Sequence, residues 1–228
     1  MTGIFDSGAG GLAALHELRR LLPSEDILFL ADTKNAPYGT KSGDEIISVA
    51  TENIKRLKSA GAERVLIACC TASAFHSYLP KEERESSVPI IAPAALEATR
   101  LSKNGRIAVI ATALSVKSHA FKRAIQSADG SIRVFEKETQ CLVEIAERVA
   151  HGEELSQNDK DTLCDAVSFI KETGADTLVL GCTHFSHLED KIKELTNGIA
   201  TVNSAKIGAR LLARTGRSGF GRTVLLEI

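Results

Sequence analysis

The sequence predicts an α/β fold of two similar parallel-sheet domains related by pseudo-symmetry, with the active site in the cleft between them. Short apolar strands alternate with amphipathic helices along the whole chain, which is typical of parallel sheets covered by helices. One segment also occurs twice, as Gly61–Cys69 and Gly174–Cys182, without a gap and at an offset of 182 − 69 = 113 residues. Each copy reads as a turn, a buried strand and a cysteine where the strand ends. Two such half-chains facing each other would place both cysteines in one pocket, because domain interfaces commonly hold small ligands.

Length and composition restrict the class of protein. A chain of 228 residues can bury a full core as one large or two small domains. A net charge of −1 gives no field that attracts nucleic acid or an anionic membrane, and 4% aromatic residues offer few stacking platforms. The N-terminus lacks a signal-peptide pattern, and no apolar run approaches the roughly 18 residues of a membrane span. We expect a cytoplasmic protein with no nucleic-acid or membrane partner, whose five cysteines are thiols rather than disulfides.

The first part of the chain contains four short apolar segments with the character of strands. These are Thr2–Phe5, Asp26–Ala31, Arg64–Ala68 and Pro89–Ile91. Helices are expected between them where apolar residues recur at helical spacing, and Ser42 with Glu45 forms a capping box. The expected helices are Leu12–Leu22, a helix capped by Ser42, Thr71–Leu79 and a helix from Pro93 onward. The charged run Lys81–Ser87 is expected to be a solvated connector.

The same alternation then restarts. The expected strands are Arg106–Ala111, Ile132–Phe135, Thr177–Leu180, Ala200–Val202 and Thr223–Glu227. The expected helices are Val116–Ser127, Cys141–His151, Leu155–Thr173, Phe185–Leu195 and Ala205–Ala213. Open α/β sheets bind ligands at the carboxyl ends of their strands. Polar residues follow two of these strands directly, with Asp6-Ser7 after the first strand and Thr112 after Arg106–Ala111.

Two opposed thiols are the arrangement that cofactor-free racemisation or epimerisation needs. One thiolate removes the α-proton from one face of the substrate, and the other thiol delivers a proton to the opposite face. Cys69 precedes a predicted helix, whose N-terminus would lower the thiol pKa from about 8.5. Asp6 can tune Cys69, and His184 can orient Cys182.

Other interpretations of the cysteines remain open. Cysteine is often a small buried apolar residue, although matching positions in a repeat disfavour that reading here. A metal site could be formed by Cys69, Cys70, Cys182 and His184, but adjacent cysteines chelate poorly in tetrahedral geometry. A cysteine hydrolase would leave the second thiol unexplained. Cys141 and Cys164 lie inside predicted helices without polar neighbours, so we expect structural roles for them.

Several motifs together resemble the cofactor-independent aspartate/glutamate racemase family. The matching segments are Gly3–Leu12, Asp32-Thr33, Pro37–Ser42, Ala68-Cys69, Thr71–Ser73 and Leu180–Phe185, in the family's order and across most of the chain. The resemblance implies a first domain formed by residues 1–91 plus 205–228, on the Cys69 side, and a second formed by residues 92–204, on the Cys182 side. It also implies an enzyme without a cofactor or metal, commonly a homodimer.

The resemblance assigns roles to individual residues. Cys69 and Cys182 match the paired acid/base thiols, and Asp6 and His184 match the residues that assist them. The substrate-binding positions implied are Ser7, Pro37, Tyr38, Gly39, Cys70, Thr71, Thr112, Glu144 and Thr183. This chain departs from the family pattern in several places. Cys70 stands where the family usually has Asn, Ser115 where threonine is usual, Phe121 where tyrosine is usual and Asn203 where aspartate is expected. The segment Glu138–Leu142 also lacks the family's Cys-Pro pair ahead of Glu144.

The expected function is therefore interconversion of L- and D-glutamate, which supplies D-glutamate for peptidoglycan. Aspartate, or another acidic amino acid, is the alternative substrate within the same class. A catalytically weak homologue with a binding or regulatory role is the alternative from another class. Cys70 raises that possibility, because a thiol is a weaker hydrogen-bond donor and acceptor than an amide.

Overall fold

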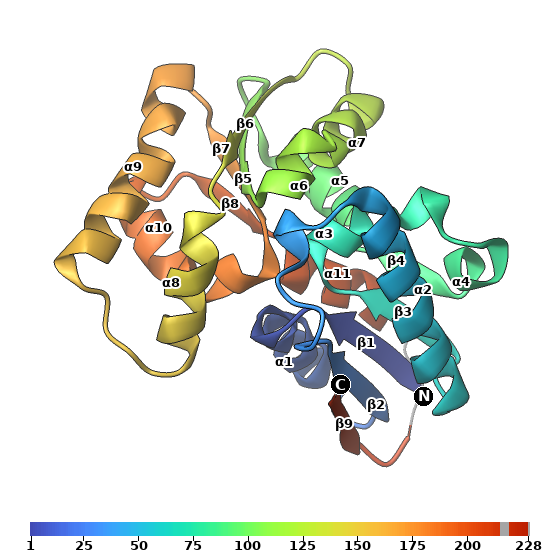
Figure 1. The fold of residues 1–228 in the computed structure, drawn as a ribbon. Coiled ribbons are helices and arrows are strands. Elements are labelled where there is room, and N and C mark those ends of the chain that lie inside the picture. Colours follow the sequence, from blue (N-terminus) through green and yellow to red (C-terminus); the bar gives the residue numbers. More distant parts are fainter. Residues whose placement is uncertain (215–218, 228) are drawn as a thin grey trace.

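The computed structural model describes residues 1–214 and 219–227, in which two parallel β-sheets lie side by side (Figure 1). The first sheet has the strand order β4-β3-β1-β2-β9. Its strands are β1 (Thr2–Asp6), β2 (Ile27–Ala31), β3 (Arg64–Ile67), β4 (Ser87–Pro89) and β9 (Thr223–Glu227). The second sheet has the order β6-β5-β7-β8. Its strands are β5 (Arg106–Ala111), β6 (Arg133–Glu138), β7 (Thr177–Gly181) and β8 (Ala200–Asn203).

The two sheets repeat one topology, which confirms the predicted fold class. Read from β4, the first sheet runs β4-β3-β1-β2, and the second runs β8-β7-β5-β6 in the same relative order. The duplicated segments form β3 and β7, each beside the first strand of its sheet. Each copy begins with a glycine at positive φ, 101° at Gly61 and 62° at Gly174. The strand β9 has no counterpart in the described part of the second sheet, since it adds to β2 from the end of the chain.

Helices cover both faces of the two sheets (Figure 1). They are α1 (Leu12–Leu21), α2 (Gly43–Ser59), α3 (Cys70–Ser73), α4 (Lys81–Glu85), α5 (Ile91–Leu101), α6 (Ala113–Lys117), α7 (Ala120–Ala128), α8 (Cys141–Ala150), α9 (Gln157–Thr173), α10 (Glu189–Leu195) and α11 (Ser204–Ala213). Short 3₁₀ helices are η1 (Ala9–Gly11), η2 (Tyr38–Thr40), η3 (His76–Tyr78) and η4 (Thr183–Leu188). The predicted capping box is present, because the Ser42 side chain accepts from the Glu45 N–H and the Glu45 carboxylate accepts from the Ser42 N–H. None of the helices in the described ranges is long and apolar enough to cross a membrane.

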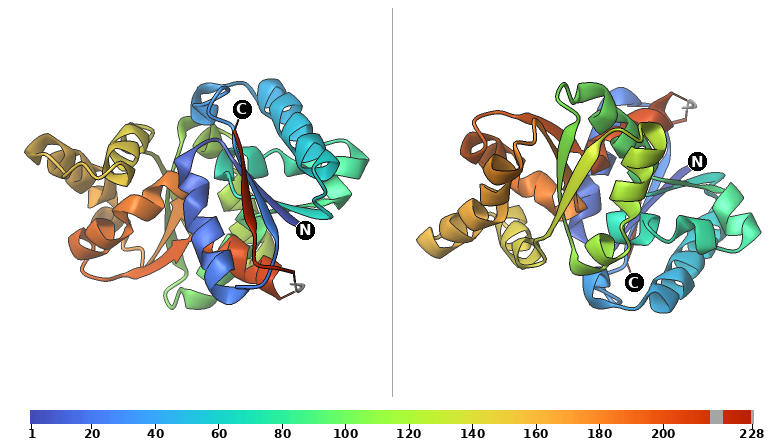
Figure 2. Two further views of the ribbon diagram at one scale, coloured as in Figure 1. Left: turned by 90° about the horizontal axis from the view of Figure 1, so that it is seen from below. Right: turned by 90° about the horizontal axis from the view of Figure 1, so that it is seen from above.

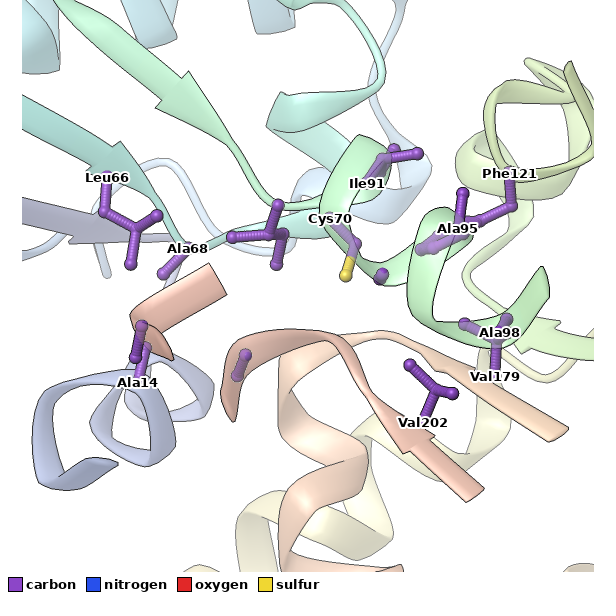
Figure 3. Packing of buried hydrophobic residues seen from close by; sticks show 14 of the residues in the cluster. Ala14, Leu66, Ala68, Cys70, Ile91, Ala95, Ala98, Phe121, Val179 and Val202 are labelled. Carbon is purple, nitrogen blue, oxygen red and sulfur yellow. The ribbon is translucent and has the colours of Figure 1, made fainter. Parts of the chain in front are cut away.

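A shared apolar core joins the two halves. It contains Leu66 from the first sheet and Val179 from the second, together with helices α1, α5, α7 and α11. Figure 3 shows part of this cluster, in which small residues such as Ala95 and Ala98 of α5 let the elements pack closely. Separate cores lie on the outer faces, under α2 in the first half and under α8 and α9 in the second. Accordingly, α2 and α9 lie at opposite ends of the molecule in both views of Figure 2.

The C-terminal segment returns to the first half. Helix α11 packs against α1 and α5, and β9 pairs with β2. The predicted division into a first domain of residues 1–91 plus 205–228 and a second of residues 92–204 stays a prediction. Residues 215–218 and 228 of that prediction lie outside the described residues. The boundaries between residues 91 and 92 and between residues 204 and 205 stay predictions.

Several predicted elements differ from the observed ones. The helix predicted over Thr71–Leu79 ends at Ser73, whose hydroxyl donates to the Ile67 carbonyl and accepts from the Ile90 N–H. Such side-chain bonds to the backbone compete with helix continuation. The helix predicted over Val116–Ser127 is divided into α6 and α7, because His119 has a φ of 52° in the left-handed region.

Two further predictions need correction. The predicted solvated connector Lys81–Ser87 contains α4, and the side chain of Glu83 is buried, with Lys55 4.0 Å away. Helix α4 packs against α2 and β4, so the side of α4 that carries Glu83 faces the protein interior. The segment Phe185–Leu195 begins as the 3₁₀ helix η4 and becomes α-helical only at Glu189.

The contribution of the left-handed Gly174, which precedes β7, to stability can be tested. We expect Gly174→Ala to lower the free energy of unfolding by about 1 kcal/mol, because a Cβ disfavours the left-handed region. Gly130→Ala is the matched control, since Gly130 is outside that region and its Cβ would meet nothing closer than the Gln126 carbonyl at 3.8 Å. Urea denaturation of both variants measures the difference. A Gly174→Ala variant as stable as the wild type would contradict the expectation.

Candidate active site

One cavity lies where the carboxyl ends of the two sheets meet. It has a volume of about 380 Å³, part of it open to solvent. The first half contributes Ser7, Ala36, Pro37, Tyr38, Gly39, Cys69, Cys70 and Thr71, and the second contributes Thr112, Gln140, Val143, Glu147, Cys182, Thr183 and His184. The strand registers explain the convergence. Phe5 lies beside Ile67 and Ala111 beside Gly181, so the residues that follow these strands reach the same edge.

Cys69 enters the cavity from the end of β3. Its side chain is buried, and its sulfur lies 3.6 Å from the Ser7 hydroxyl. Burial raises the pKa of the Cys69 thiol to about 12, with a further contribution from the Asp6 carboxylate. The lowered pKa predicted for a thiol at a helix N-terminus is therefore wrong here. Helix α3 has only four residues, and desolvation of the thiolate outweighs its field.

Cys182 enters from the end of β7 in a different electrostatic setting. Its sulfur lies 3.6 Å from Nδ1 of His184, whose Nε2 lies 3.3 Å from a carboxylate oxygen of Glu147. Burial alone would lower the pKa of His184, but the contacts with Cys182 and Glu147 outweigh it and raise that pKa to about 11. His184 is therefore a cation at neutral pH. A cation beside a thiol is the usual arrangement for activating a cysteine.

Asp6 lies beneath the cavity and does not line it. Its carboxylate is buried and accepts hydrogen bonds from the Thr183 hydroxyl at 2.9 Å and from the Gly8 N–H at 3.0 Å. Burial raises the pKa of Asp6, although the nearby His184 cation opposes that effect. The structure thus places Asp6 between the two thiol sides. It acts electrostatically on Cys69 and holds Thr183 from the other half.

A group of hydroxyls bridges the two halves at the cavity. Thr71 lies 3.0 Å from Thr112 and 3.3 Å from Ser115, and Thr112 donates to Ser115 at 2.8 Å. All three side chains are buried. The cluster combines residues from the ends of β3 and β5. It offers neutral donors and acceptors to a ligand without any formal charge.

The segment Pro37–Gly39 forms one wall of the cavity. Tyr38 and Gly39 are buried, whereas Pro37 is exposed at the mouth. Gly39 approaches the second half so closely that a Cβ there would lie 2.3 Å from the Gln140 side-chain oxygen. Only glycine fits at this position without displacing the opposite wall.

Cys70 is a third thiol at this site. Its side chain is buried and lines the cavity, yet it also belongs to the shared apolar core. Figure 3 shows Cys70 within this cluster, to which Ile91 and Ala95 of α5 also belong. Burial, followed by the proximity of Cys182, raises the pKa of the Cys70 thiol well above its usual range. Cys70 is therefore a neutral thiol between the cavity and the core.

Of the predicted residues, only Asp6 and Glu144 do not line the cavity. Glu144 is exposed, whereas Glu147, three residues later on α8, borders the cavity and contacts His184. Sequence reasoning also missed Gln140 and Val143. The spacing of Gln140, Val143 and Glu147 places them on one face of a helix, which is the signal that could have identified them.

The structure also bears on the roles predicted for Cys141 and Cys164 and on the alternative of a metal site. Cys141 and Cys164 are both exposed, so the structural role predicted for them is wrong, because neither contributes to a core. In residues 1–214 and 219–227, no three His, Cys, Asp or Glu side chains are arranged to hold a metal ion. The set Cys69, Cys70, Cys182 and His184 therefore does not form such a group.

Fold and site together define an enzyme of two similar α/β halves with one thiol from each half in a common cavity. Residues 12–212 match the model of the Asp/Glu/hydantoin racemase family, to which this chain belongs. The glutamate racemase of Desulforudis audaxviator is 36% identical over 214 residues, which are 90% of this chain and 77% of that protein.

Solved structures agree with this membership. The crystal structure of a glutamate racemase isoform from Bacillus anthracis superposes with a TM-score of 0.87 at 27% identity, over 100% of this chain and 87% of that one. The Escherichia coli glutamate racemase, solved with L-glutamate and the activator UDP-MurNAc-Ala, gives a TM-score of 0.80 at 28% identity, over 99% of this chain and 88% of that one.

The contact of His184 with Glu147, rather than with Glu144, can be tested through the pKa of His184. We expect Glu147→Gln to lower the pKa of His184 by about one unit, because it removes the negative charge that lies 3.3 Å from Nε2. Glu144→Gln is the control and should leave that pKa unchanged. The proton NMR titration of the His184 ring, assigned through a His184→Gln variant, measures both. Equal titration curves in the two glutamate variants would contradict the contact.

Proposed function

We propose that this protein is a cofactor-independent glutamate racemase that interconverts L- and D-glutamate. The observation that carries the proposal is that Cys69 and Cys182, at equivalent strand ends of two matching half-chains, line one cavity. Membership of the racemase family and the glutamate racemases among its relatives support it. The E. coli relative solved with L-glutamate supports an acidic amino acid as substrate.

The two thiols would act as base and acid on opposite faces of the α-carbon. One thiolate forms an S–H bond as the Cα–H bond breaks, and the other thiol gives its proton to the opposite face of the resulting carbanion. The electrostatics of the site fit one of the two starting states. Burial holds Cys69 protonated, while the cationic His184 lies beside Cys182. The reverse reaction starts with the protonation states exchanged.

The cavity would bind the substrate through neutral groups. Its walls carry the hydroxyls of Ser7, Thr71, Thr112 and Thr183, and no lysine or arginine is among its described lining residues. Hydroxyl and backbone N–H donors close to the α-carboxylate would also stabilise charge that develops during proton removal. His184 is the cation nearest to this chemistry.

We extend the proposal to the setting of the reaction. The D-glutamate produced would serve peptidoglycan synthesis in the cytoplasm, and the active form would be a homodimer, as the family resemblance implies. Aspartate, or another acidic amino acid, remains the competing substrate. A weakly catalytic binding protein is the competing class, because Cys70 occupies a cavity-lining position with a poor hydrogen-bonding group.

The two-thiol mechanism makes a direct prediction. Cys69→Ser and Cys182→Ser should each lower kcat by a factor of about 10² or more, because a serine hydroxyl is a far weaker acid and base partner than a thiol. Cys164→Ser, which changes an exposed thiol, is the control. Proton NMR in D₂O, with L-glutamate and L-aspartate offered separately, follows loss of the α-proton signal and product chirality. Near-full turnover by either active-site variant would refute the mechanism.

A further prediction tests whether the site has adapted around Cys70. We expect Cys70→Asn to lower both stability and racemisation, because it introduces a larger polar side chain into the shared core, at a cost of about 1–3 kcal/mol. Thermal unfolding and kcat/KM measured on the same samples separate the two effects. A large gain in kcat/KM would instead indicate a decayed site and favour the binding-protein alternative.

A further inference from the structure

Asp32 is a buried carboxylate that the proposed chemistry does not use. It follows β2 directly, and no part of it is exposed. Its Oδ1 accepts from the Asn35 backbone N–H at 3.2 Å and from the Asn35 side-chain amide at 2.9 Å. Its Oδ2 accepts from the Tyr38 hydroxyl at 2.6 Å, and from the side-chain amides of Asn53 and Asn35, both at 3.0 Å. Burying a carboxylate is costly unless donors surround it in this way.

The hydroxyl of Tyr38 is fully engaged by this cluster. It donates its single proton to Asp32 and accepts a hydrogen bond from the Asn53 amide at 3.0 Å. An acidic substrate would present carboxylates, which only accept hydrogen bonds. The Tyr38 hydroxyl therefore has no proton left for a substrate, although Tyr38 lines the cavity. This limits the substrate-binding role predicted for Tyr38 to its ring and backbone.

The same cluster holds the cavity wall at several points. Asp32 binds Asn35 at the start of the loop, Tyr38 near its tip and Asn53 on α2 beyond its end. The tip has little freedom on its other side, because a Cβ on Gly39 would lie 2.9 Å from the Thr112 Cβ. The wall is thus hydrogen-bonded to the rest of the first half and packs closely against the second half.

We propose that Asp32 is a positioning residue that fixes the Pro37–Gly39 wall of the cavity by holding the Tyr38 hydroxyl. The substrate meets the ring and backbone of this wall, and the hydroxyl stays with Asp32. The donors from Tyr38, Asn53 and Asn35 outweigh the effect of burial and hold the pKa of Asp32 below its usual range, so the carboxylate stays charged at neutral pH. The statement about substrate rests on the proposed function, whereas the Asp32–Tyr38 contact does not.

The contact can be tested without measuring activity. The protein has two tyrosines and no tryptophan, and Tyr78 is 65% exposed, so a Tyr78→Phe variant reports on Tyr38 alone. Burial, followed by the bond to Asp32 and by the charges of Cys69 and Asp6, raises the pKa of Tyr38. We expect no tyrosinate absorbance in this variant until circular dichroism shows unfolding. Ionisation near pH 10, the ordinary value, in folded protein would overturn the proposal.

The positioning role is tested by moving the carboxylate. Asp32→Asn keeps an oxygen for Asn35 but turns an amide nitrogen toward Tyr38 and Asn53. We expect KM for glutamate to rise about tenfold, with kcat within about threefold, since binding is lost equally in ground and transition states. The double variant Asp32→Asn/Asn53→Asp returns a carboxylate beside the Tyr38 hydroxyl and should restore KM to within about threefold of the wild type.

The outcomes separate the two proposals. An unchanged KM in folded Asp32→Asn, or a fall in kcat alone, would overturn the positioning role. If Asp32→Asn does not fold, the double variant decides, and failure to recover the wild-type KM in folded double variant counts against the proposal. If the wild-type protein racemises no glutamate, the proposed function fails. The Tyr38 titration in the Tyr78→Phe background, compared with and without Asp32→Asn, still decides whether Asp32 holds the hydroxyl, because burial alone also raises the pKa of Tyr38.

Discussion

The buried hydrogen bond from the Thr183 hydroxyl to the Asp6 carboxylate is the interaction on which the site depends. It joins the end of the central strand of the first sheet to the turn that carries Cys182 and His184 in the second. Space around it is minimal, since a Cβ at Gly10 would lie 2.6 Å from the Thr183 hydroxyl oxygen. A carboxylate removed from water strongly favours keeping such partners. The bond therefore fixes the relative position of the two halves at the level of the thiols.

The two thiols are related by the fold but not by their surroundings. Equivalent strand ends carry Cys69 and Cys182, yet a serine hydroxyl faces the first and an imidazolium the second. This difference arises because the loops after corresponding strands contain different residues, while the strands keep the common geometry. A duplicated scaffold can thus place two thiols in one cavity with different neighbours. Such a pair is what proton transfer in both directions requires.

The sequence predicted the strands of the two sheets more completely than it predicted the residues of the site. The repeat predicted β3 and β7 with their terminal cysteines, because apolar strands and strand-end residues depend on local pattern. It could not predict that burial would dominate the pKa of Cys69, since desolvation is set by the whole surrounding structure. The family resemblance suggested Glu144, whereas the structure places Glu147 at the cavity, because the face of α8 that meets the site depends on tertiary packing. Sequence reasoning also could not identify the hydrogen-bond partners of Asp32, because Asn53 lies 21 residues away on another element.

The hydroxyl cluster of Thr71, Thr112 and Ser115 has a consequence for how the cavity admits a ligand. These bonds cross from one half to the other, so separating the halves would break them. Each hydroxyl can then bond to water or to an entering carboxylate, and a neutral hydrogen bond exchanged for another changes the free energy little. Opening and closing at this seam is therefore an exchange of partners between neutral groups. Any separation of the two halves would in addition break the buried hydrogen bond from the Thr183 hydroxyl to the Asp6 carboxylate, which is a bond to a charged group.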